Sequence, residues 1–90
     1  AAPAITLSPP FPNPITGFAE IAYTVDDGGA VTIMVYDVKG RRVATLIDGA
    51  RTPAGSGRVR LDARNLASGV YFVRMHTPSA VLSQKITVVH

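Results

Sequence analysis

A glycine-led turn that runs directly into a dense β-forming segment constrains this chain more than any other feature. Residues 66–75 read Leu-Ala-Ser-Gly-Val-Tyr-Phe-Val-Arg-Met, and the succession of Val, Tyr, Phe and Val favours a pleated backbone. Gly69, just before that succession, permits a backbone conformation that a residue with a Cβ atom resists. We therefore expect a sharp turn and then a central strand, in which Tyr71, Val73 and Met75 face the core.

The spacing Leu-x-x-Gly-x-Tyr over residues 66–71 is similar to a tyrosine corner, in which a tyrosine at the start of a strand hydrogen-bonds back to the preceding loop. In this interpretation Tyr71 is architectural, and the alternate residues Val70, Phe72 and Arg74 face outward. No stretch of the chain matches a motif for a particular catalytic reaction. Function must therefore follow from what the domain touches and what it is attached to.

Length and composition predict one domain that folds without covalent cross-links. A chain of 90 residues buries roughly 60–68% of the surface that its unfolded form exposes. Cysteine is absent, which excludes disulfides, thiolate metal sites and cysteine nucleophiles. No apolar run approaches the ~20 residues that span a bilayer, and the N-terminal Ala-Ala-Pro-Ala lacks a signal-peptide pattern. We expect an export signal upstream, in a longer parent chain.

The first 17 residues are expected to form a proline-rich linker with a first edge strand, and residues 18–90 an immunoglobulin-like sandwich, as one domain overall. Five of the seven prolines lie in the first segment, which predicts a short strand at residues 5–7 followed by polyproline II and turns. Phe11 and Ile15 are expected to anchor this segment on its own sandwich. The alternative is a proline-rich ligand for a partner domain.

Alternating apolar and polar residues mark the remaining strands. Residues 18–25 and 31–36 alternate cleanly, with turn chemistry between them at residues 26–29. A second turn is expected at residues 37–40, then a bulged or bent edge strand at 42–47 and a loop at 48–57. The last hairpin should turn at residues 77–79. About seven short strands without a helix predict an all-β fold, an immunoglobulin-like antiparallel β-sandwich.

Catalytic and metal-binding patterns are missing from the sequence. His76 and His90 are the two histidines, and neither has a partner at metal-ligand spacing. Asp26 and Asp27 are adjacent in a short turn, which offers too few oxygen ligands for calcium. Residues 55–57 read Gly-Ser-Gly without the setting of a nucleophile elbow. We expect a non-enzymatic module with no catalytic residue, no metal and no cofactor.

Charge is divided unevenly along the chain. Residues 1–38 contain four acidic residues and no Lys or Arg, whereas residues 39–90 contain nine Lys and Arg and two acidic residues. Such polarity fits an anionic partner, for example lipopolysaccharide, a phospholipid surface or nucleic acid. It also fits charges scattered over solvated faces, because the two halves of a sandwich sequence interleave in space.

One outer sheet face is a candidate contact surface. It forms if the strands at residues 31–36, 70–75 and 82–88 share a sheet, as in the immunoglobulin arrangement. Apolar area rimmed by cations is typical of a contact site. The alternative is that the proline-rich segment or long arginine side chains cover the apolar residues. The residues of this face are Met34, Tyr36, Phe72, Arg74, Ser83, Lys85 and Thr87.

Several motifs follow one another in a recognisable order. They are Phe-Pro-Asn-Pro at residues 11–14, Ile-Ala-Tyr at 21–23, the segment 31–46 with its Val-Tyr-Asp-Val-Lys-Gly-Arg, the corner segment 66–74, and Lys-Ile-Thr-Val at 85–88. Together they resemble the type A C-terminal sorting domain of the Por, or type IX, secretion system of Bacteroidetes. They are also similar to the immunoglobulin-like domain of flagellar hook-capping proteins. The family often has Trp-Asp-Gly before the corner, where this chain has Leu61-Asp62-Ala63.

The resemblance implies a non-catalytic C-terminal module of a larger secreted enzyme, often a glycoside hydrolase or a protease, which acts in type IX sorting and cell-surface attachment. Its implied partners are the outer-membrane secretion machinery and the cell envelope, including anionic lipopolysaccharide. Nucleic acid and a transmembrane segment are not implied. We expect a monomer that is secreted or held at the surface of a Gram-negative cell.

The predicted partner-binding residues combine the family motifs with the candidate face: Gly40, Arg41, Phe72, Arg74, Lys85, Ile86 and Val88. A carbohydrate-binding module appended to a glycoside hydrolase is the alternative function. The chain has no tryptophan, so the aromatic platform of such a module would have to use Tyr23, Tyr36, Tyr71 or Phe72. A passive spacer domain is a third possibility.

Overall fold

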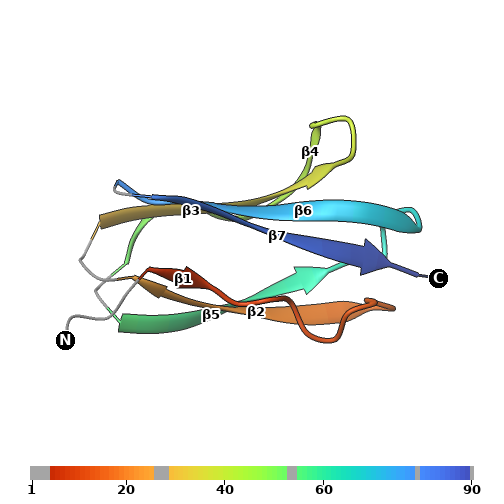
Figure 1. Cartoon of the computed structure of the whole chain (residues 1–90), viewed down its shortest axis with the longest axis horizontal. Helices are drawn as coiled ribbons and strands as arrows, with labels where there is room; N and C mark the ends of the chain where they lie inside the picture. The colour runs from red at the N-terminus through yellow and green to blue at the C-terminus, as the bar shows by residue number, and fades with distance from the viewer. Residues whose placement is uncertain (1–4, 26–28, 53–54, 79, 90) are drawn as a thin grey trace.

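Two antiparallel β-sheets are stacked face to face in the protein (Figure 1). A computed structural model describes residues 5–25, 29–52, 55–78 and 80–89. The strands are β1 Thr6–Leu7, β2 Phe18–Val25, β3 Gly29–Asp37, β4 Arg42–Thr52, β5 Gly55–Asp62, β6 Gly69–His76 and β7 Val81–Val88. One sheet has the order β1-β2-β5 and the other β4-β3-β6-β7. The predicted all-β sandwich of seven strands is confirmed.

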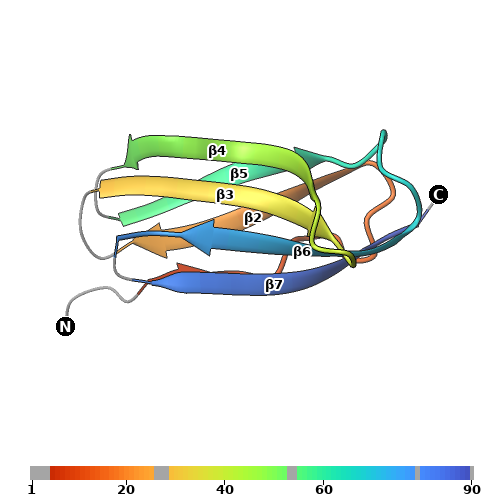
Figure 2. The same cartoon turned by 90° about the horizontal axis from the view of Figure 1, so that it is seen from above.

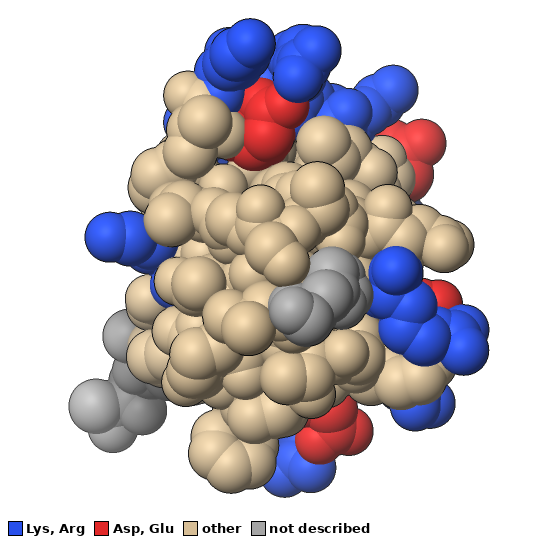
Figure 3. All heavy atoms as spheres, turned by 90° about the vertical axis from the view of Figure 1, so that its right-hand side faces the viewer, with Lys and Arg blue, Asp and Glu red and all other residues tan. Residues whose placement is uncertain are grey.

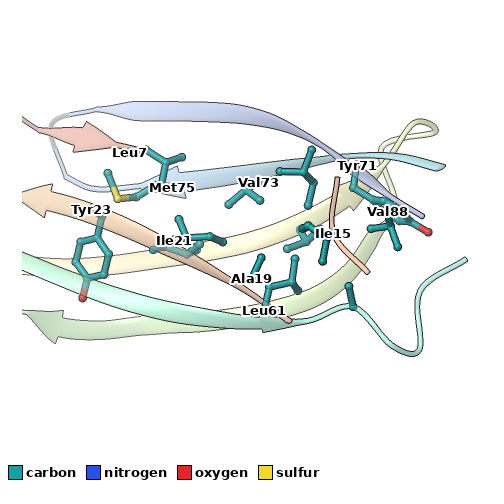
Figure 4. Close-up of a cluster of buried hydrophobic side chains, with 14 of the residues drawn as sticks. Leu7, Ile15, Ala19, Ile21, Tyr23, Leu61, Tyr71, Val73, Met75 and Val88 are labelled. Carbon is teal, nitrogen blue, oxygen red and sulfur yellow. The ribbon is translucent and has the colours of Figure 1, made fainter. Parts of the chain in front are cut away.

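The core lies between the two sheets because each strand turns alternate side chains inward. In β2 the residues Ala19, Ile21, Tyr23 and Val25 are buried, while their neighbours are exposed or half-buried. Ile33, at the centre of β3 in the other sheet, is fully buried and belongs to the same cluster. Burial of one such aliphatic side chain stabilises the fold by about 1.5–3 kcal/mol. Figure 4 shows this single cluster between the layers.

The predicted tyrosine corner is present before β6. Gly69 has a φ of +153°, a conformation that L side chains rarely adopt. The Tyr71 hydroxyl donates to the Ala67 carbonyl oxygen at 2.7 Å. Tyr71, Val73 and Met75 are buried, whereas Phe72 and Arg74 are exposed. The corner therefore fixes which side chains of β6 face outward.

Strands β3, β6 and β7 are neighbours in the four-stranded sheet, as the immunoglobulin arrangement requires (Figure 2). β4 lies on the other side of β3, at the edge of the sheet. Its pairing with β3 shifts register between Val31 and Ile33, between Ile33 and Met34, and between Val35 and Tyr36. The predicted bulged edge strand is thus confirmed.

The proline-rich segment packs on the sandwich, but only one of its two predicted anchors is buried. Ile15 has no exposed surface and lies in the core near Val88 (Figure 4). Phe11 is 78% exposed, so its prediction as an anchor is wrong. The backbone of Phe11 holds this position, because its N–H and C=O groups pair with Glu20 of β2 at 3.0 and 2.8 Å.

The loop predicted over residues 48–57 is also wrong for residues 48–52 and 55–57, and residues 53 and 54 lie outside the described residues. β4 continues to Thr52, and β5 begins at Gly55. Ala50 and Arg51 pair with β3, and Gly55, Ser56 and Gly57 pair with β2. Gly and Ala are poor strand signals, but pairing with a neighbouring strand overrides intrinsic propensity.

Gly57 has a packing reason to lack a side chain. The Tyr23 ring passes beneath Gly57, and a Cβ atom there would collide with the Tyr23 hydroxyl. The composition that indicated a loop therefore reflects a close approach within the sheet.

Two predicted turns lie partly outside the described residues. Residues 26–28 of the first turn and Ser79 of the last hairpin are not described. The end of that hairpin is described, and Thr77 N–H donates to the Ala80 carbonyl at 2.9 Å. In the described part of the chain, no helix has the length and apolarity needed to cross a membrane.

Candidate functional site

The outer face of the four-stranded sheet brings predicted residues from three strands together. The registers of β4, β3, β6 and β7 align these residues in rows across the sheet. The first row is Arg42, Tyr36, Phe72 and Lys85; the second is Thr45, Met34, Arg74 and Ser83; the third is Thr32, His76 and Val81. We call these three rows the four-strand face.

Aromatic and sulfur-containing side chains form the middle of the four-strand face. Phe72 is 38% exposed, which is high for a large apolar side chain in a central strand. The Arg74 guanidinium lies 5.2 Å from the centre of the Tyr36 ring, a cation–π arrangement. The Tyr36 hydroxyl donates to Met34 Sδ at 3.4 Å. These contacts link the side chains of Met34, Tyr36 and Arg74 to one another.

A shallow hollow lies beside these side chains. It has a volume of about 310 Å³, and its lining comes from Thr32, Met34, Tyr36 and His76. His76 is exposed on this face, as expected for a surface histidine. The described residues include no group of three or more His, Cys, Asp or Glu side chains that could hold a metal ion.

The four-strand face has cations without carboxylate partners. Within the described ranges, the three ion pairs are Arg41 with Asp37, Arg58 with Glu20, and Arg64 with Asp62. None of them includes Arg42, Arg74 or Lys85, and the three rows contain no acidic residue. The face therefore presents three uncompensated positive charges around an apolar centre.

The turn between β3 and β4 holds the predicted residues Gly40 and Arg41. Gly40 has a φ of +81°, and its N–H donates to the Asp37 carbonyl at 3.0 Å. The Asp37 carboxylate accepts from the backbone N–H groups of Lys39 and Arg41, each at 2.9 Å. The turn is therefore built on the Asp37 side chain, as the Asp at its first position favours.

Asp37 also sets the electrostatics of this turn. The backbone N–H of Arg41, which donates to the carboxylate, is the largest cause of a lowered Asp37 pKa; partial burial opposes it, and the Arg41 guanidinium adds to it at 2.9 Å. Figure 3 shows this end of the sandwich, where Lys and Arg gather over the projecting turn at the top with acidic atoms beside them.

The predicted partner-binding residues divide into three places. Phe72, Arg74 and Lys85 lie together on the four-strand face, and Gly40 and Arg41 lie in the turn at its end. Ile86 and Val88 face the opposite way, into the core, with at most 1% of their surface exposed. Gly40, Arg41, Phe72, Arg74 and Lys85 are therefore placed where a partner could contact them, whereas Ile86 and Val88 are not. The binding role of all seven residues remains a prediction.

The proline-rich segment does not supply the cover that we considered for this face. In the described part of that segment, the backbone hydrogen bonds of residues 8–15 go to β2 and to the end of β7. Arginine side chains do lie on the face, since Arg74 lies over Tyr36, but Phe72 remains accessible.

A contact that the sequence did not indicate joins the two ends of the chain. Asn13 Oδ1 accepts from the Thr87 N–H at 3.1 Å, and the Ile15 N–H donates to the Thr87 carbonyl at 2.8 Å. The available signal was an Asn between two prolines, because an Asn side chain readily hydrogen-bonds to backbone groups outside regular strand pairing.

The aromatic platform of the alternative function is not assembled. Tyr23 and Tyr71 are 8% and 7% exposed and belong to the core. Tyr36 and Phe72 remain on the four-strand face, with a cation over the Tyr36 ring. This distribution does not favour a sugar-binding surface of stacked aromatic rings.

Comparison with known proteins gives a family. The curated proteins compared with the chain yield no match. A family model described as a secretion system C-terminal sorting domain matches residues 10–89, which is nearly the whole chain. These domains mark proteins for export to the cell surface or beyond it, and they are not themselves catalytic. The chain belongs to the C-terminal sorting domains of the type IX secretion system.

Proposed function

We propose that this domain presents the four-strand face and the β3–β4 turn to the type IX secretion machinery as one continuous recognition surface. The family assigns the sorting role, and the observation that supports this surface is the set of uncompensated cations around exposed Phe72. Exposed apolar area inside a charged rim is the usual composition of a specific contact site.

The same positive charges also support a second role for the domain, attachment to the cell surface after export. Arg42, Arg74 and Lys85 are available to anionic groups of the envelope, such as the phosphates of lipopolysaccharide. In this proposal the domain attaches its cargo to the outside of the outer membrane after export. We further propose that it works as a monomer, and that the parent protein is a secreted hydrolase.

A reporter fusion tests the proposed function. A periplasmic reporter enzyme followed by this chain, expressed in a cell with a type IX system, should appear on the cell surface and be accessible to added protease. The same fusion lacking residues 85–90 should remain in the periplasm, because both Lys85 and the β7 contacts are lost. Normal export of the truncated fusion would contradict the sorting role of β7.

Truncation also removes buried Ile86 and Val88, so a second fusion separates recognition from folding. The double variant Arg74→Ser, Lys85→Ser leaves the core intact and should reduce export of the reporter. Release of exported reporter into the medium at low salt would contradict attachment to the envelope but leave the sorting role standing.

A further inference from the structure

The outer edge of β7 is closed at its C-terminal end. Asn13 accepts from the Thr87 N–H, and Ile15 donates to the Thr87 carbonyl. Val89 N–H in turn donates to the Ile15 carbonyl at 2.9 Å. The proline-rich segment thus pairs with the last residues of the chain as a short parallel bridge.

The rest of that edge is open. Because backbone groups alternate in direction along a strand, Val81, Ser83 and Lys85 turn their N–H and C=O groups to the same side as Thr87, away from β6. No backbone hydrogen bond joins these groups to any described residue. Residues 81–85 therefore form an unpaired strand edge, which is a template for another strand.

We propose that an extended acidic segment of a partner protein adds to this edge as a fifth strand of the four-stranded sheet. This inference rests on the proposed function, because an added strand continues the rows of the four-strand face. Main-chain hydrogen bonds to residues 81–85 supply the affinity, and alternate side chains supply the specificity.

The rows specify which side chains the added strand needs. On the outer side its residues lie beside Val81, Ser83 and Lys85. A carboxylate beside Lys85 pairs with an uncompensated cation, and a glutamate beside Ser83 is a diagonal neighbour of the same lysine. Val81 is 57% exposed and favours an apolar neighbour. An antiparallel segment therefore reads acidic-x-acidic-x-apolar.

A second copy of this chain fits the edge less well. β7 reads Val-Leu-Ser-Gln-Lys-Ile-Thr-Val and contains no acidic residue. Antiparallel pairing of two β7 edges around Ser83 places Lys85 beside Val81 of the second copy. Both lysines then lose solvent without gaining a carboxylate, which is unfavourable.

The remaining edges are less suited to an acidic strand. β1 has two residues, and the register shifts of β4 disturb its pairing line. β5 pairs regularly with β2, but Arg58 lies 3.9 Å from the Glu20 carboxylate and Arg60 lies over the Phe18 ring. An acidic strand at β5 would compete with Glu20 for Arg58, whereas no carboxylate among the described residues lies within ion-pair distance of Lys85.

Titration with short peptides tests the proposal. The ¹⁵N-labelled 90-residue chain is titrated with the blocked peptide Thr-Glu-Thr-Glu-Thr-Val-Thr, and with the same peptide in which both Glu are Lys. The acidic peptide should shift the amide signals of Val81, Ser83 and Lys85 and slow their hydrogen exchange. The lysine peptide should leave them unchanged.

Two variants separate backbone pairing from charge. Ser83→Pro removes one outward N–H and should abolish the shifts, and its matched control is Ser56→Pro, whose N–H points to the open edge of β5. Lys85→Glu keeps every backbone group and should weaken acidic-peptide binding by at least about fivefold, since like charges replace an opposite pair. Lys85→Glu still tests the proposal if Ser83→Pro does not fold.

Three results would overturn the inference: no binding of the acidic peptide, equal binding by Lys85→Glu, or protection of the edge amides without peptide together with dimerisation, which would assign the edge to a second copy. In the reporter fusion, normal export of Ser83→Pro together with reduced export of the Arg74→Ser, Lys85→Ser variant would reject the added strand and leave the proposed function intact.

Discussion

The outer faces of the two sheets carry similar residues but use them differently. Each face has a partly exposed phenylalanine with arginines near it, Phe72 at 38% and Phe18 at 37%, and the three-stranded sheet also has Phe11, 78% exposed, paired with Glu20 of β2. On the three-stranded sheet, Arg60 and Arg64 lie over the Phe18 ring at 3.8 and 4.6 Å, and Arg64 also pairs with Asp62 at 2.9 Å. These arginines of the three-stranded sheet are therefore in contact with an aromatic ring or a carboxylate of the same domain.

The four-strand face leaves its cations without carboxylate partners in the described part of the chain, although Arg74 lies over the Tyr36 ring at 5.2 Å. Arg42, Arg74 and Lys85 have no carboxylate within ion-pair distance among the described residues, and Phe72 has no cation over its ring. A side chain that already has an ion pair within the domain contributes little extra binding energy when a partner protein approaches. An unpaired cation can form a new ion pair with that partner. The difference supports the proposal that the four-strand face is the contact surface.

The largest expected effect concerns the packing of the three-stranded sheet. Gly57→Ala should lower the free energy of unfolding by about 1–3 kcal/mol, because the new Cβ atom collides with the Tyr23 hydroxyl. Gly17→Ala is the matched control, since a Cβ atom there has nothing within 4 Å. Urea unfolding of both variants measures the difference. Equal stability of the two would mean that the Tyr23 ring does not constrain this sheet.

The tyrosines of the two sheets should differ in what their hydroxyl groups contribute. Tyr71→Phe removes the hydrogen bond to the Ala67 carbonyl and should cost about 1 kcal/mol of unfolding free energy. Tyr23→Phe should cost less, because its hydroxyl has no hydrogen bond to a described residue. Thermal or urea unfolding compares the pair. A larger loss for Tyr23→Phe would remove the corner as the feature that orients β6.

The smallest expected effect is the pH response of the three-stranded face. The side-chain hydrogen bond from Arg64 lowers the pKa of Asp62 from 3.8 to about 2. A carboxylate with a depressed folded-state pKa contributes stability above its unfolded pKa and loses it as the pH falls through the folded value. Stability should therefore decline slightly between about pH 4 and pH 2, and Asp62→Asn should flatten that decline.

Carboxyl NMR titration gives the direct readout for Asp62. A side-chain pKa near 4 in the folded domain would show that Arg64 is not held on Asp62, and the contrast between the two faces would lose one of its charge pairs.

Periodicity predicted the strands well, because burial of one face imposes a two-residue repeat that is visible in the sequence. The bounds of β2, the inward residues of β3 and β6, and the corner at Tyr71 all follow from local pattern. The β3, β6 and β7 part of the four-strand face also followed, once these strands were placed in one sheet, but its β4 residues Arg42 and Thr45 were not predicted and the predicted Thr87 lies outside the three rows.

Contacts distant in sequence were the part that local pattern missed. The bond from Thr87 to Asn13 joins residues 74 positions apart, and Tyr23 beneath Gly57 is a contact between strands. Phe11 and Ile15 look equivalent as apolar residues among prolines, yet only Ile15 reaches the core. Such choices depend on register and on the position of the neighbouring strand.

Matched double variants on the two faces test the central claim most directly. The first double variant, Phe72→Ser with Arg74→Ser, changes the four-strand face. The second, Phe18→Ser with Arg60→Ser, makes the same two kinds of substitution on the outer face of the three-stranded sheet. Both are fused to the same reporter, checked for folding by NMR, and scored for export through the type IX system. We predict that the first variant loses most export and the second exports normally; equal export of the two, or loss by the second alone, would contradict the assignment of the four-strand face.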